Sequence, residues 1–190
     1  MIAIRPYEDL AAMAVFRRLD VHDQIEAELV RGVSCTALAL FADWRAAQAQ
    51  GPLSLVAVSG PAARPFAVLC LGNTGQAGVG QAALLACDHT RHRTDIARLA
   101  VAIRADMPGW CAERGIFRLE ARCWAGHPTA SALLASIGFA HECDMAGFGG
   151  PTRATFRQFA WTAPPVPPAD HPPLAIDLDP IPPEVPDVHT

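Results

Sequence analysis

The chain contains no lysine: all fifteen of its basic residues are arginines. This absence excludes a mechanism that forms a Schiff base on a lysine side chain. The 190 residues include 51% hydrophobic side chains and carry a formal net charge of −4. Such a length and composition fit one globular domain of about 100–200 residues with some additional chain. We expect neither nucleic acid nor a membrane as a partner.

The chain also lacks paired cysteine motifs and long apolar runs. Its six cysteines form no C-x-x-C pair, and the apolar stretches around Cys70, Cys87 and Cys123 favour buried reduced thiols over disulfides. No run reaches the ~18 uninterrupted apolar residues that a membrane span requires. The N-terminus has no charged segment followed by an apolar one. These absences predict a reducing, cytoplasmic location.

The composition changes at Ala163. Ten of the seventeen prolines follow it, together with five acids and no arginine. Proline at this density excludes helix and central strand. Two interpretations remain open: a solvated polyproline-type tail, or an extended peptide that binds another protein through aliphatic side chains. We therefore assign residues 1–161 to one domain and 162–190 to an acidic, proline-rich tail. Its candidate partner-binding residues are Leu174, Ile176, Leu178, Ile181, Val185 and Val188.

Hydrophobic periodicity and turn residues predict a mixture of helices and strands in the domain. The first helical pattern is broken near Asp20, and the central helix is expected to end at Gly115. In chain order, the predicted elements are a strand at 2–5, helices at 10–30 and 35–48, strands at 53–58, 66–71 and 82–87, a helix at 94–114, a strand at 116–123, a helix after His127, and strands from about 141 and at 155–161.

A motif follows the strand at 116–123. Its residues 127–139 read His-Pro-Thr-Ala-Ser-Ala-Leu-Leu-Ala-Ser-Ile-Gly-Phe. They resemble the last motif of the GNAT acyltransferase superfamily, Asn-x-x-Ala-x-x-Leu-Tyr-x-x-x-Gly-Phe, with His127 in place of the asparagine and Leu134 in place of the tyrosine. The order of elements resembles that superfamily over nearly all of residues 1–161. The resemblance implies an α/β (α+β) fold with a mixed, largely antiparallel sheet flanked by helices, in which the strand 82–87 lies beside 116–123 and splays from it at one end. The matching residues are Ala130, Leu133, Gly138 and Phe139.

Shorter strings narrow the resemblance. Residues 119–122, 125–127, 135–139, 147–149 and 159–161 look like parts of the small acetyltransferase-like proteins that podovirus-type phages and prophages encode among their head and tail genes. This likeness implies phage structural proteins as partners. It also implies a location in the host cytoplasm or in the virion.

The resemblance locates a cofactor loop at residues 91–96. GNAT proteins bind the acetyl-CoA pyrophosphate on backbone N–H groups at a helix start, through Arg/Gln-x-x-Gly-x-Gly/Ala. Here Arg91 and Arg93 are candidate anion ligands, but Thr94 and Ile96 occupy the glycine positions. The Ile96 side chain obstructs close approach, and the charge of Asp95 repels phosphate. We expect no bound cofactor.

The resemblance also implies a carboxylate base and a tyrosine acid. The tyrosine position holds Leu134, and the one tyrosine of the chain is Tyr7. Glu120 and His127 are the catalytic candidates; the alternatives are an arginine-paired Glu120 and a helix-capping His127. Residues 88–92 contain a His-x-x-His spacing without further clustered ligands, so we expect no metal.

Two functions from different classes follow. In the first, a phage-type GNAT-fold protein has lost its cofactor chemistry and acts as a virion or assembly component that docks through its tail. In the second, the protein is an acetyl-CoA-dependent N-acyltransferase with an atypical pyrophosphate loop. The loss of the glycines, the tyrosine and the asparagine favours the first.

Overall fold

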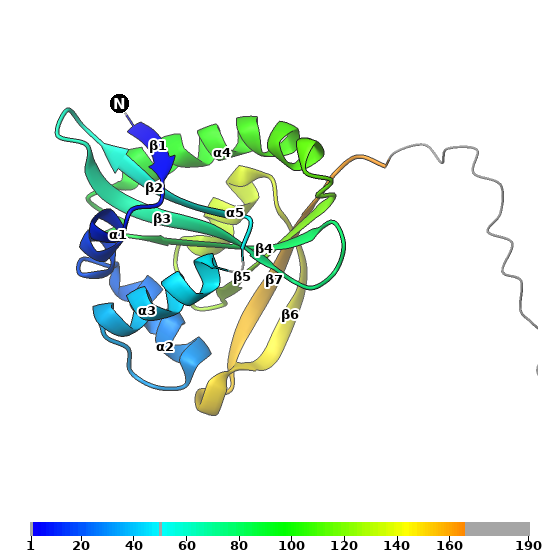
Figure 1. The fold of residues 1–190 in the computed structure, drawn as a ribbon. Helices are drawn as coiled ribbons and strands as arrows, with labels where there is room; N and C mark the ends of the chain where they lie inside the picture. The colour runs from blue at the N-terminus through cyan, green and yellow to red at the C-terminus, as the bar shows by residue number, and fades with distance from the viewer. Residues whose placement is uncertain (1, 50, 166–190) are drawn as a thin grey trace, which may run out of the picture.

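The computed structural model describes residues 2–49 and 51–165. Within them the chain forms a seven-stranded sheet flanked by helices (Figure 1). The proposed tail residues 174–188 lie outside the described residues. The elements are β1 (Ile2–Pro6), α1 (Asp9–Phe16), α2 (Val21–Arg31), α3 (Ala37–Gln48), β2 (Leu53–Ser59), β3 (Arg64–Asn73), β4 (Val79–Ala86), α4 (Arg93–Glu113), β5 (Arg118–Trp124), α5 (Ala130–Ile137), β6 (Ala140–Gly149), a 3₁₀ turn (Gly150–Thr152) and β7 (Ala154–Thr162).

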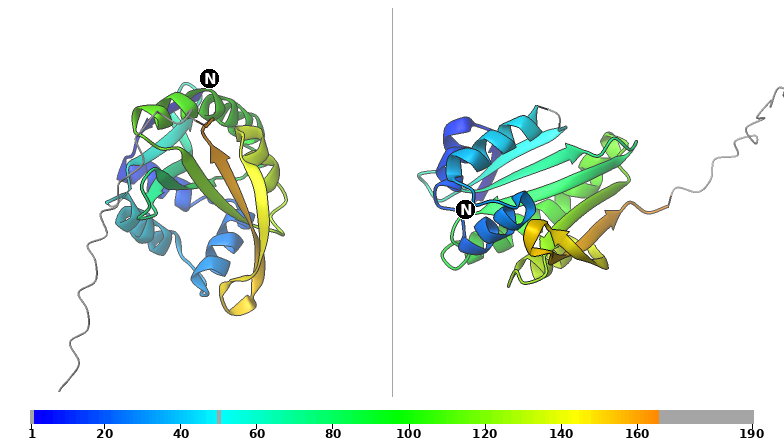
Figure 2. Two further views of the ribbon diagram at one scale, coloured as in Figure 1. Left: turned by 90° about the vertical axis from the view of Figure 1, so that its right-hand side faces the viewer. Right: turned by 90° about the horizontal axis from the view of Figure 1, so that it is seen from below.

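The strand order is β1-β2-β3-β4-β5-β7-β6. Only β4 and β5 are parallel among these neighbours, and the other pairs are antiparallel. The β6–β7 hairpin forms one edge of the sheet beside β5 (Figure 2). The expected mixed, largely antiparallel sheet is confirmed.

Helices cover both faces of the sheet because the strands carry apolar side chains on both faces. On one face, Val15 and Phe16 of α1 and Trp44 of α3 pack against Val56 and Val68 of the sheet. The other face carries α4 and α5, whose buried side chains join those of β5 and β7 in a second cluster. The close approach of α5 to β6 uses Gly138, which ends the helix with a φ of 112°. A side chain is strained at such an angle, which explains the Gly-Phe pair of the motif.

The predicted helix 10–30 is two helices, with a break next to Asp20 as the pattern indicated. Asp20 caps α2 by accepting the N–H of His22 at 2.9 Å. Leu19 forms an antiparallel bridge with Cys87, just beyond β4. The linker between α1 and α2 thus pairs with the end of β4, which lies inside the sheet.

The strands β4 and β5 separate at one end, as expected. They pair only from Val79 to Ala82 on β4 and from Arg118 to Ala121 on β5. Both strands continue beyond this ladder, to Ala86 and Trp124. We call this opening the splay, with its closed end at Ala82 and Ala121 and its wide end at Ala86 and Trp124. No helix in the described part of the chain is both long and apolar enough to cross a membrane.

Candidate active site

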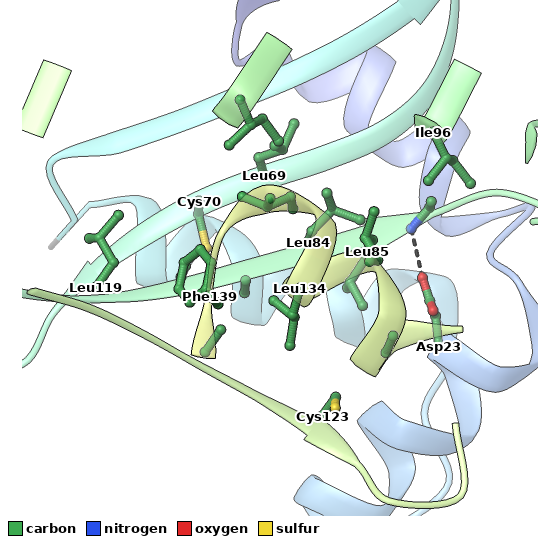
Figure 3. Close-up of a pocket in the computed structure, with 18 of the residues that line it drawn as sticks. Asp23, Leu69, Cys70, Leu84, Leu85, Ile96, Leu119, Cys123, Leu134 and Phe139 are labelled. Carbon is green, nitrogen blue, oxygen red and sulfur yellow. Dashed lines mark hydrogen bonds between the residues drawn. The ribbon is translucent and has the colours of Figure 1, made fainter. Parts of the chain in front are cut away.

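A cavity of about 550 Å³ opens at the splay. Its walls come from the sheet, from α2, and from α4 and α5, and most of its lining is apolar (Figure 3). A concave apolar site with a few convergent polar groups is the usual form of a small-molecule site. The polar and charged lining residues are Asp23, Glu26, His89, Arg93, Asp106, Arg122, His127 and Thr129.

Two carboxylates of α2 bind the backbone at the wide end of the splay. Asp23 Oδ2 accepts the N–H of Ala86 at 2.7 Å, the contact dashed in Figure 3. Glu26 Oε2 accepts the N–H of Trp124 at 2.8 Å. Separated strands leave their inward-facing N–H groups without ladder partners. The two carboxylates replace those partners, so α2 fixes the separation of the strands.

Asp23 is also the centre of a buried hydrogen-bond network. Its Oδ1 accepts from His127 Nε2 at 3.0 Å and lies 3.2 Å from His89 Nε2. Burial alone would raise the pKa of the Asp23 carboxyl, but the hydrogen bonds from His127, His89 and Ala86 outweigh it and lower the pKa. Burial would lower the pKa of His89, but its contact with the Asp23 carboxylate raises it. An ionised Asp23 and a protonated His89 therefore stabilise each other.

His127 caps α5. Its Nδ1 accepts the backbone N–H groups of Thr129 at 3.2 Å and Ala130 at 3.0 Å. The hydrogen of the neutral ring is therefore on Nε2, which donates to Asp23. Both ring nitrogens are engaged, so His127 has no free nitrogen with which to accept a proton from a substrate. The catalytic role considered for His127 does not fit this geometry.

The same tautomer argues against a metal at this cluster. Asp23, His89 and His127 bring their ligand atoms within 4.8 Å of one another. A metal on His127 Nε2 would require the hydrogen to move to Nδ1. That nitrogen accepts two backbone N–H groups, so ligation would break the cap of α5. The donor set fits a hydrogen-bond network and not a metal centre.

Glu26 is the second titratable group at the wide end. Burial, with a smaller contribution from the negative charge of Asp23, raises the pKa of Glu26 to about 7, although the hydrogen bond from the N–H of Trp124 opposes the increase. A carboxyl group that titrates near neutrality is suited to proton transfer. Its position is less suitable, because Trp124, whose N–H it accepts, is about 10 Å along β5 from Ala121 at ~3.3 Å per residue. Glu26 is thus remote from the closed end.

Glu120 lies beside the closed end. It precedes Ala121, and its neighbours Leu119 and Ala121 face the α4 and α5 side. Because side chains alternate along a strand, Glu120 is on the opposite face of the sheet. There it accepts from Arg118 Nε at 2.8 Å, and Arg122 is 3.8 Å away. Arg118 also binds Glu142 through both of its terminal nitrogens, at 2.9 and 2.6 Å.

The cofactor loop begins α4. Arg93 and Ile96 line the cavity, whereas Arg91 and Thr94 are not among the lining residues of the described chain. Asp95 is 3.5 Å from His92 Nδ1 and 3.7 Å from Arg98. Arg98 therefore offsets part of the negative charge of Asp95, so the electrostatic obstacle is smaller than the sequence indicates. The steric obstacle to phosphate remains, because the Ile96 side chain forms part of the cavity wall.

No tyrosine of the described residues lines the cavity in place of the tyrosine of the motif. Leu134 lines the cavity with an apolar side chain. Tyr7 packs with the cluster under α1 and α3, on the other face of the sheet. Burial, reinforced by Asp9, raises the pKa of Tyr7 to about 12. Tyr7 therefore does not serve the cavity as an acid.

Several solved structures with a similar fold are acetyltransferases. A GNAT-family acetyltransferase from Bacillus anthracis has a TM-score of 0.63 at 11% identity, covering 85% of this chain and 94% of that one. The ribosomal-protein-S18-alanine N-acetyltransferase of Escherichia coli has a TM-score of 0.60 at 16% identity, covering 88% and 97%. A phosphinothricin acetyltransferase from Sinorhizobium meliloti in complex with AcCoA has a TM-score of 0.60 at 11% identity, covering 85% and 88%. No family model and no curated protein matches the sequence.

The GNAT fold expected from the sequence is thus confirmed. The expectation of a phage structural component without cofactor chemistry is wrong. Structural neighbours are acetyltransferases, some of them with acetyl-CoA bound, and nothing among the findings supports a phage origin or a virion location. These neighbours favour the acetyl-CoA-dependent alternative, and the expected lack of a cofactor has no support.

Proposed function

We propose that the protein is an acetyl-CoA-dependent N-acyltransferase with an atypical pyrophosphate loop. The observation that carries this proposal is the cavity at the splay, which runs between two strand edges in a fold shared with acetyltransferases. The cavity begins at the N-terminus of α4 and extends past the closed end of the splay. Glu120 is beside the closed end, on the opposite face of the sheet.

The edge of β4 supports the binding of an amide-containing arm. The N–H of Cys87 binds Phe66 of β3, and the N–H of Ala86 points into the splay toward Asp23. Backbone groups alternate in direction along a strand, so Leu84 directs its N–H and C=O into the splay beyond the last paired residue. The pantetheine arm of coenzyme A contains two amides, which can pair with such an edge as an added strand does.

The N-terminus of α4 supports the binding of phosphate. Its first N–H groups have no intrahelical partners and carry the positive end of the helix dipole. Arg93 adds a positive charge on the cavity wall. The Ile96 side chain leaves a phosphate less room to approach the backbone than a glycine would. The charge of Arg93 therefore replaces part of the phosphate binding that the glycine loop provides in the motif. The chain therefore fits acetyl-CoA through one arginine and a helix start.

The bound cofactor would supply an acyl group activated as a thioester. An extended pantetheine arm matches about four residues of extended chain, ~14 Å, which brings the reacting carbon from α4 to the closed end. Glu120, on the opposite face of the sheet, would receive through water the proton that the acceptor amine loses as its nitrogen bonds to the acyl carbon, while the carbon–sulfur bond breaks and coenzyme A leaves as its thiolate. Arg118 and Arg122 hold the Glu120 carboxylate in place.

The test is acyl transfer by the purified full chain from acetyl-CoA to a panel of amines and peptide N-termini, with products detected by mass spectrometry. Thiol reagents are unsuitable because Cys143 is exposed. Replacement of Arg93 by Ala should weaken acetyl-CoA binding at least tenfold in calorimetry, whereas Arg91→Ala, a matched control outside the cavity, should not. No transfer to any amine together with no binding of acetyl-CoA would overturn the proposal.

A further inference from the structure

The cavity has two chemically different parts. Its wide end carries the Asp23 network, whereas the part at and beyond the closed end has walls of hydrocarbon, thioether and indole. Figure 3 shows Leu119 and Phe139 on the side away from Asp23. Asp106, which is exposed, is the charged residue of this part of the described lining. The apolar walls include Leu53, Leu71, Met107, Trp110, Leu119 and Phe139.

The cavity is longer than an acetylated pantetheine arm. Lining residues extend along α4 from Arg93 to Trp110, which is roughly 25 Å at 1.5 Å per residue. The strand geometry agrees, because Leu119 pairs with Gly80, about 20 Å along β4 from Ala86. With phosphates at the start of α4 and an arm of ~14 Å, about 6 Å of apolar cavity by the strand length and about 11 Å by the helix length remain beyond the thioester.

We infer that the preferred donor carries a linear aliphatic acyl chain of about six to eight carbons, which lies in the apolar part of the cavity between α4 and the sheet. This inference rests on the proposed function and specifies its donor. The remaining length of ~6–11 Å corresponds to about five to nine bonds at ~1.2 Å per bond, a range centred on such a chain. An aliphatic chain in this part of the cavity would contact apolar side chains of α4, α5 and the sheet. A polar acyl group would find no buried charged partner in this part of the described lining. An acetyl group would leave this volume unfilled.

Burial of an acyl chain should appear as a regular gain in affinity with chain length. Each buried methylene contributes about a fourfold change in the dissociation constant, from ~0.8 kcal/mol per methylene. The gain should stop when the cavity is full. A flat dependence is expected instead if only an acetyl group enters.

The test uses unreactive S-alkyl coenzyme A thioethers with ethyl, butyl, hexyl, octyl and dodecyl chains, titrated calorimetrically into the full chain. We expect affinity to rise about fourfold per methylene to hexyl or octyl and to level off at dodecyl. Acyl transfer from the corresponding thioesters should show the same optimum. Equal affinities from ethyl to octyl would overturn the inference and leave the proposed function intact. A failure of every thioether to bind would overturn both.

Two variants of Met107, which is 9% exposed on α4, locate the chain. Met107→Trp should remove the gain from butyl to octyl and leave ethyl binding unchanged. Val101→Trp is the matched control, because Val101 is on the same helix with 70% of its surface exposed. Met107→Ala keeps the test valid if the larger variant does not fold, since it should move the optimum to longer chains. An unchanged optimum in a folded Met107 variant would contradict the inference.

Discussion

The two ends of the splay are built in different ways. At the wide end, α2 holds the strands apart by accepting one N–H from each of them, at Ala86 and Trp124. At the closed end a short parallel ladder holds the strands together, and apolar side chains line the cavity. The polar network at the wide end therefore keeps the two strands apart, and the cavity continues from this opening to the apolar closed end. We expect changes at the wide end to affect stability and changes at the closed end to affect reaction and substrate choice.

The largest expected effect is at the closed end. Glu120→Gln removes the proposed base and should lower kcat about 10²–10⁴-fold, with little change in melting temperature. Glu142→Gln is the matched control, because both carboxylates bind Arg118 but Glu142 is on the edge strand β6. Steady-state kinetics of both variants measure the change in kcat. Equal activity in the two would remove Glu120 from the reaction.

The largest stability effect is expected at the wide end. Asp23→Ala leaves the N–H of Ala86 and the ring N–H groups of His89 and His127 without their acceptor. Loss of one member of a buried charged network costs about 3–5 kcal/mol. Denaturant unfolding should show this decrease, whereas Asp144→Ala, an exposed residue on β6, should change stability by under ~0.5 kcal/mol. A small effect of Asp23→Ala would show that α2 does not hold the strands.

The same end should make stability depend on pH. The pKa of Glu26 is about 7 in the fold and 4.5 ordinarily, so the folded state retains a proton that the unfolded chain loses above pH 4.5. Stability should thus fall by up to ~3 kcal/mol as pH rises from about 4.5 to 7. The raised pKa of His89 acts in the same direction, with stability present below pH 6.5 and lost as pH rises through its folded pKa. In the Glu26→Gln variant, stability should decrease less with rising pH, because the contribution of Glu26 is absent. An unchanged pH profile in this variant would contradict the assignment.

Sequence patterns predicted much of the closed end and little of the wide end. The order of elements and the turn at Gly138 follow from local periodicity and glycine chemistry, whereas the partial pairing of β4 with β5 is implied by the resemblance to GNAT proteins. Asp23 and Glu26 share a helix face by their spacing of three residues, a signal that indicates a common partner surface. Their partners Ala86, Trp124 and His127 are 63 to 104 residues away, so no local pattern reveals them. The sequence offers helix capping by His127 as an alternative because Ala130 is three residues away, whereas no local pattern reveals the hydrogen bond of His127 to Asp23.

The smallest effect is expected from removing the chain after Pro165. The last described contact of the domain is the N–H of Ala163, which binds the carbonyl of Phe117 at 2.8 Å beyond the end of β7. A chain ending at Pro165 retains this bond and every strand pair, so its melting temperature and its affinity for acetyl-CoA should match those of the full chain within error. A chain ending at Arg157 loses the β7 residues that pair with Arg118 to Ala121 of β5 and should not fold, which makes it the contrasting control. A decrease of several degrees on removal of 166–190 would mean that the acidic, proline-rich segment binds the domain itself, and the comparison of the two ends would then need a third element.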